Sequence, residues 1–108
     1  MSSPREVIEI HQLLDRDSCS NFSAYLVKLE PHQVKKASFH KKGEELYYVL
    51  SGSGQAKLGD ASYSLKTGCF FRVPPSTIHE FTTEGDSLHL LNFHSPPVFA
   101  DHDTYFVE

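Results

Sequence analysis

The chain has 108 residues, a length that suits one domain with a single hydrophobic core. Its formal net charge of -4 at pH 7 and its sequence pI of about 5.9 argue against the basic surface of a nucleic-acid-binding protein. It has no apolar run of membrane-span or signal-peptide length, and Cys19 and Cys69 do not form a CxxC motif. We therefore expect a soluble cytoplasmic protein with two reduced thiols and with neither nucleic acid nor a membrane as partner.

Short β-rich segments separated by turn signals make up most of the chain. Residues 9–15 are predicted to form a turn of helix or a loop at most, because the apolar stripe there is short. The segments predicted as strands are residues 22–29, 46–50, 55–58, 63–65, 69–73, 78–83 and 88–93. Clusters of Gly, Pro, Ser and Asp lie between them, including the Ser-Gly-Ser-Gly run at 51–54. Many short strands at close spacing predict an all-β sandwich or barrel built from antiparallel pairs.

The C-terminal tail begins with two prolines, Pro96 and Pro97, which lack the N–H that regular strand pairing needs. Residues 104–107 are expected to pack back as a last edge strand, so that the tail covers a sheet edge or a partner subunit. No second domain or repeat is visible, so residues 1–108 are predicted to form one domain.

His40, Glu45 and His79 have the composition of a metal site, since two imidazoles and a carboxylate are a recognised ligand set. His40 and Glu45 flank residues 41–44, which we predict to be the turn of a hairpin that brings the two side chains together. His79 follows a proline turn far along the chain and must be added by the tertiary structure.

Strand parity assigns the neighbours of this set to faces, because residues two apart in a strand point to the same side. Tyr47 should therefore share the inward face of Glu45, while Glu44 points away. Ser38 should share the face of His40 on the strand before the predicted hairpin.

These segments resemble the two signature motifs of the cupin superfamily over about residues 29–92. The positions that match are His40, Glu45 and Gly52 in the first motif and Gly68, Pro74 and His79 in the second. The resemblance implies a single-domain cupin-type antiparallel jelly-roll β-barrel with little helix and an internal pocket. It implies His40, Glu45 and His79 as ligands of a divalent transition metal: iron, manganese, nickel or zinc.

The chain departs from the motifs at three positions. Ser38 replaces the first metal histidine, and a neutral hydroxyl is a poor ligand for a transition metal. His32 and Ser76 occupy two positions where the motifs have glycine. His89 and His94 lie on opposite faces of the segment around 88–93, so one of them could turn inward and replace the lost ligand. A surface or structural hydrogen bond is the alternative for each of the two.

Ser38, Tyr47 and His94 are the candidates for contact with a substrate. The aromatic residues Tyr47, Phe71, Phe81 and Phe93 form either an apolar pocket wall or ordinary core. Arg72 is interpreted as part of a salt bridge at the rim or on the surface.

The sequence supports two main hypotheses about function. The first is a metal-dependent enzyme that acts on a small organic molecule as an oxygenase, isomerase or lyase. The alternative is a non-catalytic module that binds a small molecule or uses a metal only for structure. A weaker possibility is a chain that functions through its dimer surface and keeps only a vestigial pocket. We expect a homodimer, with residues 5–10 and 104–107 as candidate pairing edges.

Overall fold

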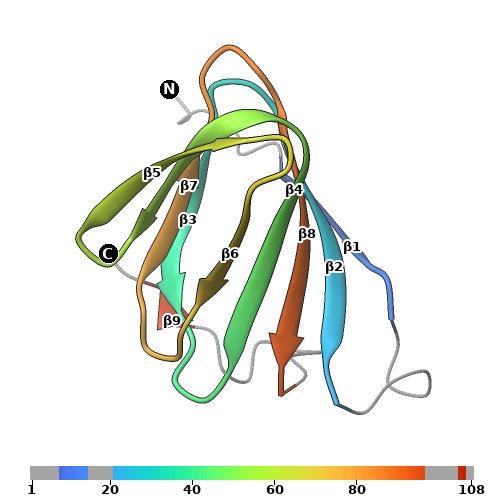
Figure 1. Ribbon diagram of the computed structural model, residues 1–108, viewed down its shortest axis with the longest axis vertical. Coiled ribbons are helices and arrows are strands. Elements are labelled where there is room, and N and C mark those ends of the chain that lie inside the picture. Colours follow the sequence, from blue (N-terminus) through green and yellow to red (C-terminus); the bar gives the residue numbers. More distant parts are fainter. Residues whose placement is uncertain (1–7, 15–20, 97–104, 107–108) are drawn as a thin grey trace, which may run out of the picture.

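The computed structural model describes residues 8–14, 21–96 and 105–106, and these residues form nine strands and no helix (Figure 1). The strands are β1 (Ile8–Gln12), β2 (Ser23–Leu29), β3 (Val34–Phe39), β4 (Glu44–Leu58), β5 (Ala61–Lys66), β6 (Phe70–Val73), β7 (His79–Thr82), β8 (Leu88–Ser95) and β9 (Tyr105–Phe106). All of their pairings are antiparallel. The expected all-β jelly-roll barrel is confirmed. Within the described part of the chain, no helix is long and apolar enough to cross a bilayer.

The strands form two sheets that face each other (Figure 1). The first sheet has the order β1-β2-β8-β4-β6, and the second has the order β5-β4-β7-β3-β9. Strand β4 belongs to both sheets and is the bridge between them. The core lies between the sheets and contains, among others, Leu29, Val49, Phe81, Leu88 and Leu90, all of which are fully buried.

Strand β4 differs from the prediction of two strands separated by a turn at 51–54. Glu44–Leu58 is one continuous strand of 15 residues, and its pairing with β8 shifts between Val49 and Ser51. Gly52 next to this shift has φ of 88°, and a Cβ on it would lie 1.8 Å from the carbonyl oxygen of Ser87. The glycines therefore produce a bend that carries the strand from one sheet into the other, and they do not end it.

Two further predictions about local structure are wrong. Residues 9–15 were expected to be a helical turn or loop, but Ile8–Gln12 is strand β1, which pairs along its whole length with β2. The neighbouring strand supplies the backbone hydrogen bonds that so short a helix could not retain. The second error is the hairpin at 41–44, because β3 pairs with β7 and β9 and has no pairing with β4. The residues between β3 and β4 instead cross from the second sheet to the first.

The predicted last edge strand is confirmed for Tyr105–Phe106, which form β9 and pair with Ser38 and Phe39 of β3. Residues 104 and 107 of that prediction lie outside the described part of the chain. Cys19 and His102 also lie outside it, whereas Cys69 is described and is a free cysteine.

Candidate metal centre

Two cross-strand pairs place the candidate residues inside the barrel. Glu45 on β4 is directly opposite His94 on β8 in the first sheet. Ser38 on β3 is directly opposite His79 on β7 in the second sheet. Residues directly opposite in an antiparallel pair have their Cβ atoms about 5 Å apart, so each pair presents two side chains at one point. Both pairs are buried, and they meet between the sheets.

His40 completes the group from the segment that follows β3. Its carbonyl oxygen accepts a hydrogen bond from the backbone N–H of Ser76, which ties this segment to the proline turn before His79. The predicted proximity of His40 and Glu45 is therefore correct although the predicted hairpin is not. The crossing between sheets brings the two residues together.

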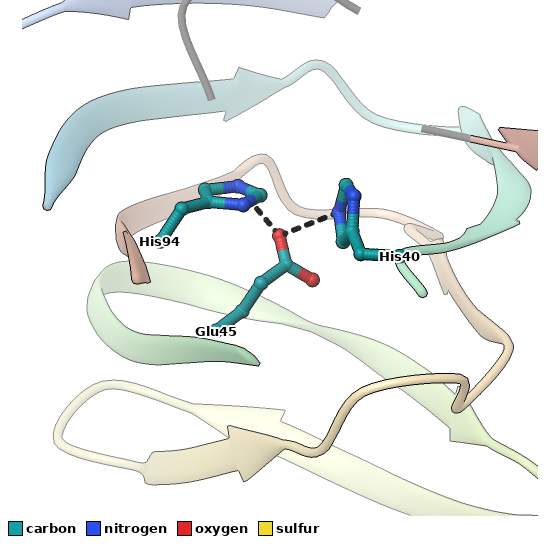
Figure 2. A group of neighbouring side chains, drawn as sticks. All are labelled: His40, Glu45 and His94. Carbon is teal, nitrogen blue, oxygen red and sulfur yellow. Dashed lines mark ion pairs between the residues drawn. The ribbon is translucent and has the colours of Figure 1, made fainter. Parts of the chain in front are cut away.

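Three imidazole rings surround the Glu45 carboxylate. Nε2 of His94 lies 2.7 Å and Nε2 of His40 lies 3.3 Å from Oε1, and Figure 2 shows these two rings on either side of that oxygen. Nε2 of His79 lies 3.0 Å from Oε2. The side chains are 1% to 8% exposed, so the cluster is almost completely removed from solvent.

The tautomer of His79 follows from its second ring nitrogen. Nδ1 lies 3.3 Å from the carbonyl oxygen of Thr77, which can only accept a hydrogen bond, so Nδ1 carries a proton. In the neutral ring Nε2 then has only a lone pair, and it faces Oε2 of Glu45 at 3.0 Å. Oε2 is buried, and His79 could donate a hydrogen bond to it from Nε2 only as a doubly protonated, positively charged ring. Two acceptors at this distance require a proton or a metal ion between them.

The charge of Glu45 is stabilised by its surroundings. Burial alone would raise the pKa of this carboxyl, but hydrogen bonds with His40, His79 and His94, together with the charge of His79, hold the pKa well below its usual range. The site is therefore arranged around a carboxylate that remains ionised although it is buried.

Tyr47 supports the carboxylate from the same strand. Its hydroxyl donates a hydrogen bond of 3.0 Å to Oε1 of Glu45, as expected for residues that share a strand face. Burial, the charge of Glu45 and this hydrogen bond raise the pKa of Tyr47 well above its usual value. Tyr47 therefore remains protonated, and its hydroxyl acts as a donor to Glu45.

The aromatic residues around Tyr47 belong to the core on one side of the site. Tyr47 stacks on Phe71 with ring centroids 5.1 Å apart and meets Phe81 edge-on at 5.0 Å. Phe93 does not join them, because it alternates with the inward-facing Asn92 and His94 and lies on the outer face of the first sheet.

The donor set fits a divalent transition metal. Three imidazoles and one carboxylate are available, and nitrogen and oxygen ligands of this kind bind zinc, iron, manganese and nickel. One ligand atom each from His40, Glu45 and His94 lies within 4.8 Å of the others. Oε2 of Glu45 is buried and has no hydrogen-bond partner among the described residues, and a cation would compensate for this acceptor.

The structure also decides between the two histidines of β8. His94 is 7% exposed and points into the cluster, whereas His89 has the opposite parity and faces away. A surface position is therefore wrong for His94, whereas the structural hydrogen bond offered with it agrees with the contact between His94 and Glu45. The sequence could not separate the two, because apolar residues occupy both faces of this strand: Leu88 and Leu90 on one and Leu91 and Phe93 on the other.

Other residues lie where parity placed them. Glu44 points away from the site, and its Oε2 accepts a hydrogen bond of 2.8 Å from Nε of Arg72, so the predicted surface salt bridge of Arg72 is confirmed. His32 is exposed in a turn, as expected.

A hollow of about 320 Å³ is lined by Phe22, Glu44, Leu46, Phe93, His94 and Ser95. Glu44, Leu46 and Phe93 have the opposite parity to Glu45 and His94, so this hollow lies on the outer face of the first sheet and not between the sheets. A second cavity of about 360 Å³ is lined by residues of β4, β5 and β6, among them Phe71, and includes no residue of the histidine cluster.

Comparison with known proteins identifies a family and a fold. A family model for the cupin domain matches residues 25–93. An uncharacterized protein of Methanocaldococcus jannaschii is 33% identical over 70 residues, which cover 64% of this chain and only 55% of that relative.

Several solved structures share the fold at low sequence identity. Pac13 of Streptomyces, solved with uridine and described as a nucleoside dehydratase, superimposes with a TM-score of 0.78 at 20% identity, covering 98% of this chain and 82% of that chain. KdgF of Halomonas superimposes with a TM-score of 0.77 at 20% identity, covering 85% of this chain and 81% of that chain. The DMSP lyase DddQ of Ruegeria pomeroyi superimposes with a TM-score of 0.80 at 16% identity, covering 93% of this chain and 51% of that chain.

Proposed function

The chain belongs to the cupin domain family, and on this basis we propose that it is a small metal-binding barrel that takes up a small organic molecule. In this proposal His40, Glu45 and His79 hold a divalent transition metal: iron, manganese, nickel or zinc. The observation that carries the proposal is the contact between Nε2 of His79 and Oε2 of Glu45, two buried atoms 3.0 Å apart that need a proton or a metal ion between them. A metal ion bound to both atoms would take the place of the second proton that His79 otherwise needs on Nε2.

The bound metal would supply a Lewis acid that polarises an oxygen of the organic ligand. The chain itself holds the ligand atoms in place. The carbonyl of Thr77 orients the ring of His79, and the hydroxyl of Tyr47 orients the Glu45 carboxylate. Tyr47, Phe71 and Phe81 exclude water from one side of the site.

An enzyme is the first candidate, with oxygenase, isomerase or lyase chemistry. Two of the structurally similar proteins are described as a nucleoside dehydratase and as a DMSP lyase. We therefore propose to screen small organic acids and nucleosides for lyase and dehydratase reactions first, and for oxygen-dependent reactions second.

A non-catalytic binding module is the second candidate. It is supported by Ser38, which stands where the family motif has its first metal histidine and which removes one ligand from that set. Ligand binding without turnover in the metal-loaded protein would favour this candidate, whereas turnover that depends on the metal would favour the enzyme.

Elemental analysis of the purified protein tests the metal site directly. We expect near-stoichiometric metal in the natural protein and a loss of most of it in His40→Ala and His79→Ala. Glu44→Gln is the matched control, because it removes a carboxylate one residue away that faces Arg72 on the surface. A folded natural protein that stays free of metal after incubation with iron, manganese, nickel and zinc would contradict the proposal.

A further inference from the structure

We propose that His94 is itself a metal ligand, which replaces from strand β8 the histidine that Ser38 has displaced on strand β3. The inference rests on the proposed metal site but concerns a residue outside both family motifs. The site would then have four protein ligands, His40, Glu45, His79 and His94, and two of them would come from each side of the barrel.

The position of His94 is built into the sheet. It lies directly opposite Glu45 in the register of β4 and β8, and Leu88, Leu90 and Asn92 of the same strand face share its inward direction. Its Nε2 is 2.7 Å from Oε1 of Glu45, the shortest of the three contacts between imidazole nitrogens and this carboxylate. Figure 2 shows its ring pointing at the same oxygen that His40 approaches from the other side.

The protonation of His94 also allows it to bind a metal. Its Nδ1 is buried and has no hydrogen-bond partner among the described residues, so no contact at this nitrogen fixes the tautomer of the ring. In the neutral tautomer with the proton on Nδ1, Nε2 has a lone pair that faces the cluster and is free to bind a metal.

The distances around His94 allow a metal to be bound with small side-chain movements. Ligands about 2.1 Å from a tetrahedral metal are about 3.4 Å apart. The ligand atoms of His40, Glu45 and His94 already lie within 4.8 Å of one another, and the rings of His40 and His94 have centroids 4.7 Å apart at an angle of 84°. Rotation about the side-chain bonds of these residues can shorten the present separations between ligand atoms to the separation that the metal requires.

The replacement changes which side of the metal is open. A histidine at position 38 would bind from β3 beside His79, whereas His94 binds from the opposite sheet beside Glu45. The short side chain of Ser38 leaves the β3 side of the metal to an exogenous ligand, with a buried hydroxyl available to hydrogen-bond to it.

The test compares His94→Gln with His89→Gln, which removes a histidine from the outer face of the same strand. Zinc affinity is measured by competition with a chromophoric chelator, and the number of bound imidazoles is measured by X-ray absorption spectroscopy of the zinc-loaded proteins. We expect His94→Gln to weaken zinc binding by more than about 100-fold and to lower the imidazole count by one. Loss of a residue that only positions another ligand typically costs about 10–100-fold and leaves the count unchanged. His89→Gln should behave like the natural protein in both measurements.

A second variant tests the replacement itself and guards against a folding defect. Ser38→His combined with His94→Gln should restore the imidazole count and recover at least about tenfold of the lost affinity, because it returns the ligand to the β3 side. An unchanged imidazole count in folded His94→Gln would overturn the inference, even if the affinity falls. Absence of metal from the natural protein would instead defeat the proposed function, so the two failures can be distinguished.

Discussion

Glu45 is the residue on which the candidate site depends. It is 2% exposed, and its two oxygens face three imidazoles and one phenol hydroxyl. A buried carboxylate is unfavourable unless it is paired, so these contacts are needed for its ionised form. The same contacts couple the stability of the metal-free protein to pH.

The pKa of Glu45 predicts the direction of that coupling. In the folded protein it lies well below the value of about 4.3 expected for the unfolded chain. The stabilisation from the ionised carboxylate is therefore present above about pH 4.3 and is lost as the pH falls through the lower, folded-state value. We expect the unfolding free energy of the natural protein, measured by urea denaturation with a chelator present, to fall more steeply between pH 5 and 3 than that of Glu45→Gln. Parallel pH profiles would contradict this prediction.

Among the residues that the structure describes, two that are not glycine adopt the left-handed backbone conformation that normally favours glycine. They are His32, with φ of 59°, and Ser76, with φ of 65°. These are the two positions at which the family motifs have glycine. The departure from the motif at each position therefore stores backbone strain, and Ser76 does so in the turn that precedes His79.

Ser76→Gly is expected to stabilise the protein. The left-handed conformation costs a residue with a side chain about 1–2 kcal/mol, while glycine loses about 0.5–1 kcal/mol more conformational entropy on folding. The net gain in unfolding free energy should be about 0.5–1 kcal/mol, measured by urea denaturation. Ser62→Gly on the exposed strand β5 has only the entropic cost, so it should lower stability by about 0.5–1 kcal/mol. Equal changes in unfolding free energy for Ser76→Gly and Ser62→Gly would contradict the explanation from the positive φ of Ser76.

At the scale of the elements, the bend in β4 determines how the site is assembled. Residues Glu44 to Val49 pair in the first sheet with β8, and Ser53 to Leu58 pair in the second sheet with β5 and β7. One strand thus fixes both sheets relative to each other (Figure 1). Gly52 lies next to the register shift where the strand passes from one sheet to the other.

Gly52→Ala is expected to destabilise the fold severely. The new Cβ would meet the carbonyl oxygen of Ser87 at 1.8 Å, and the backbone φ is 88°. Gly59→Ala is the matched control, because its φ is also positive, at 59°, but nothing lies within 4 Å of the new Cβ. Thermal and urea unfolding should show a loss of about 1–2 kcal/mol for Gly59→Ala and at least about 3 kcal/mol, or no folding, for Gly52→Ala. Similar losses of stability in the two variants would show that the close approach to the Ser87 carbonyl does not cause the destabilisation of Gly52→Ala.

At the scale of the whole molecule, the outer face of the first sheet is unusually apolar. Leu26, Leu91, Tyr48 and Phe70 lie directly opposite one another on β2, β8, β4 and β6, and Leu46 and Phe93 form a second apolar pair beside them. Tyr48 is 38% exposed and Phe70 is 61% exposed. Outer faces of antiparallel sheets are normally polar, so this face is suited to contact with another protein surface.

We propose that a second copy of the chain covers this face. Four strands about 4.8 Å apart and about 20 Å long give two packed copies an interface on the order of 1,000 Å², near the lower limit for a specific contact. This contact would use a sheet face, whereas the sequence suggested pairing through the chain ends. The edge strands β1 and β9 remain the alternative surfaces for a homodimer.

Sedimentation velocity tests the proposed dimer. We expect a dimer at tens of micromolar for the natural protein, and a monomer for Tyr48→Lys combined with Phe70→Lys, because two like charges directly opposite each other would be buried without partners. Tyr63→Lys is the control, since Tyr63 is 52% exposed but lies on β5 of the other sheet. A monomeric natural protein would contradict the proposal, and so would a dimer that survives the double substitution.

The sequence by itself predicted the all-β jelly-roll fold and much of the site. Period-two alternation decided that Glu45 and Tyr47 share the inward face and that Glu44 does not, because parity is a local property of a strand. Motif spacing selected His40 and His79, both of which the structure places beside Glu45. The soluble cytoplasmic location and the absence of nucleic acid remain predictions from composition.

Tertiary structure alone decided the rest. Whether the Gly-rich run at 51–54 ends a strand or bends it depends on what packs against it, and here the Ser87 carbonyl occupies the space. The choice of His94 over His89 depends on which apolar face of β8 meets the core, and the local pattern is the same for both. The partners of β3 are strands β7 and β9, which lie far away in the sequence. Alternation along one strand is a short-range property that the sequence contains, whereas the pairing between distant strands is settled only when the two sheets pack.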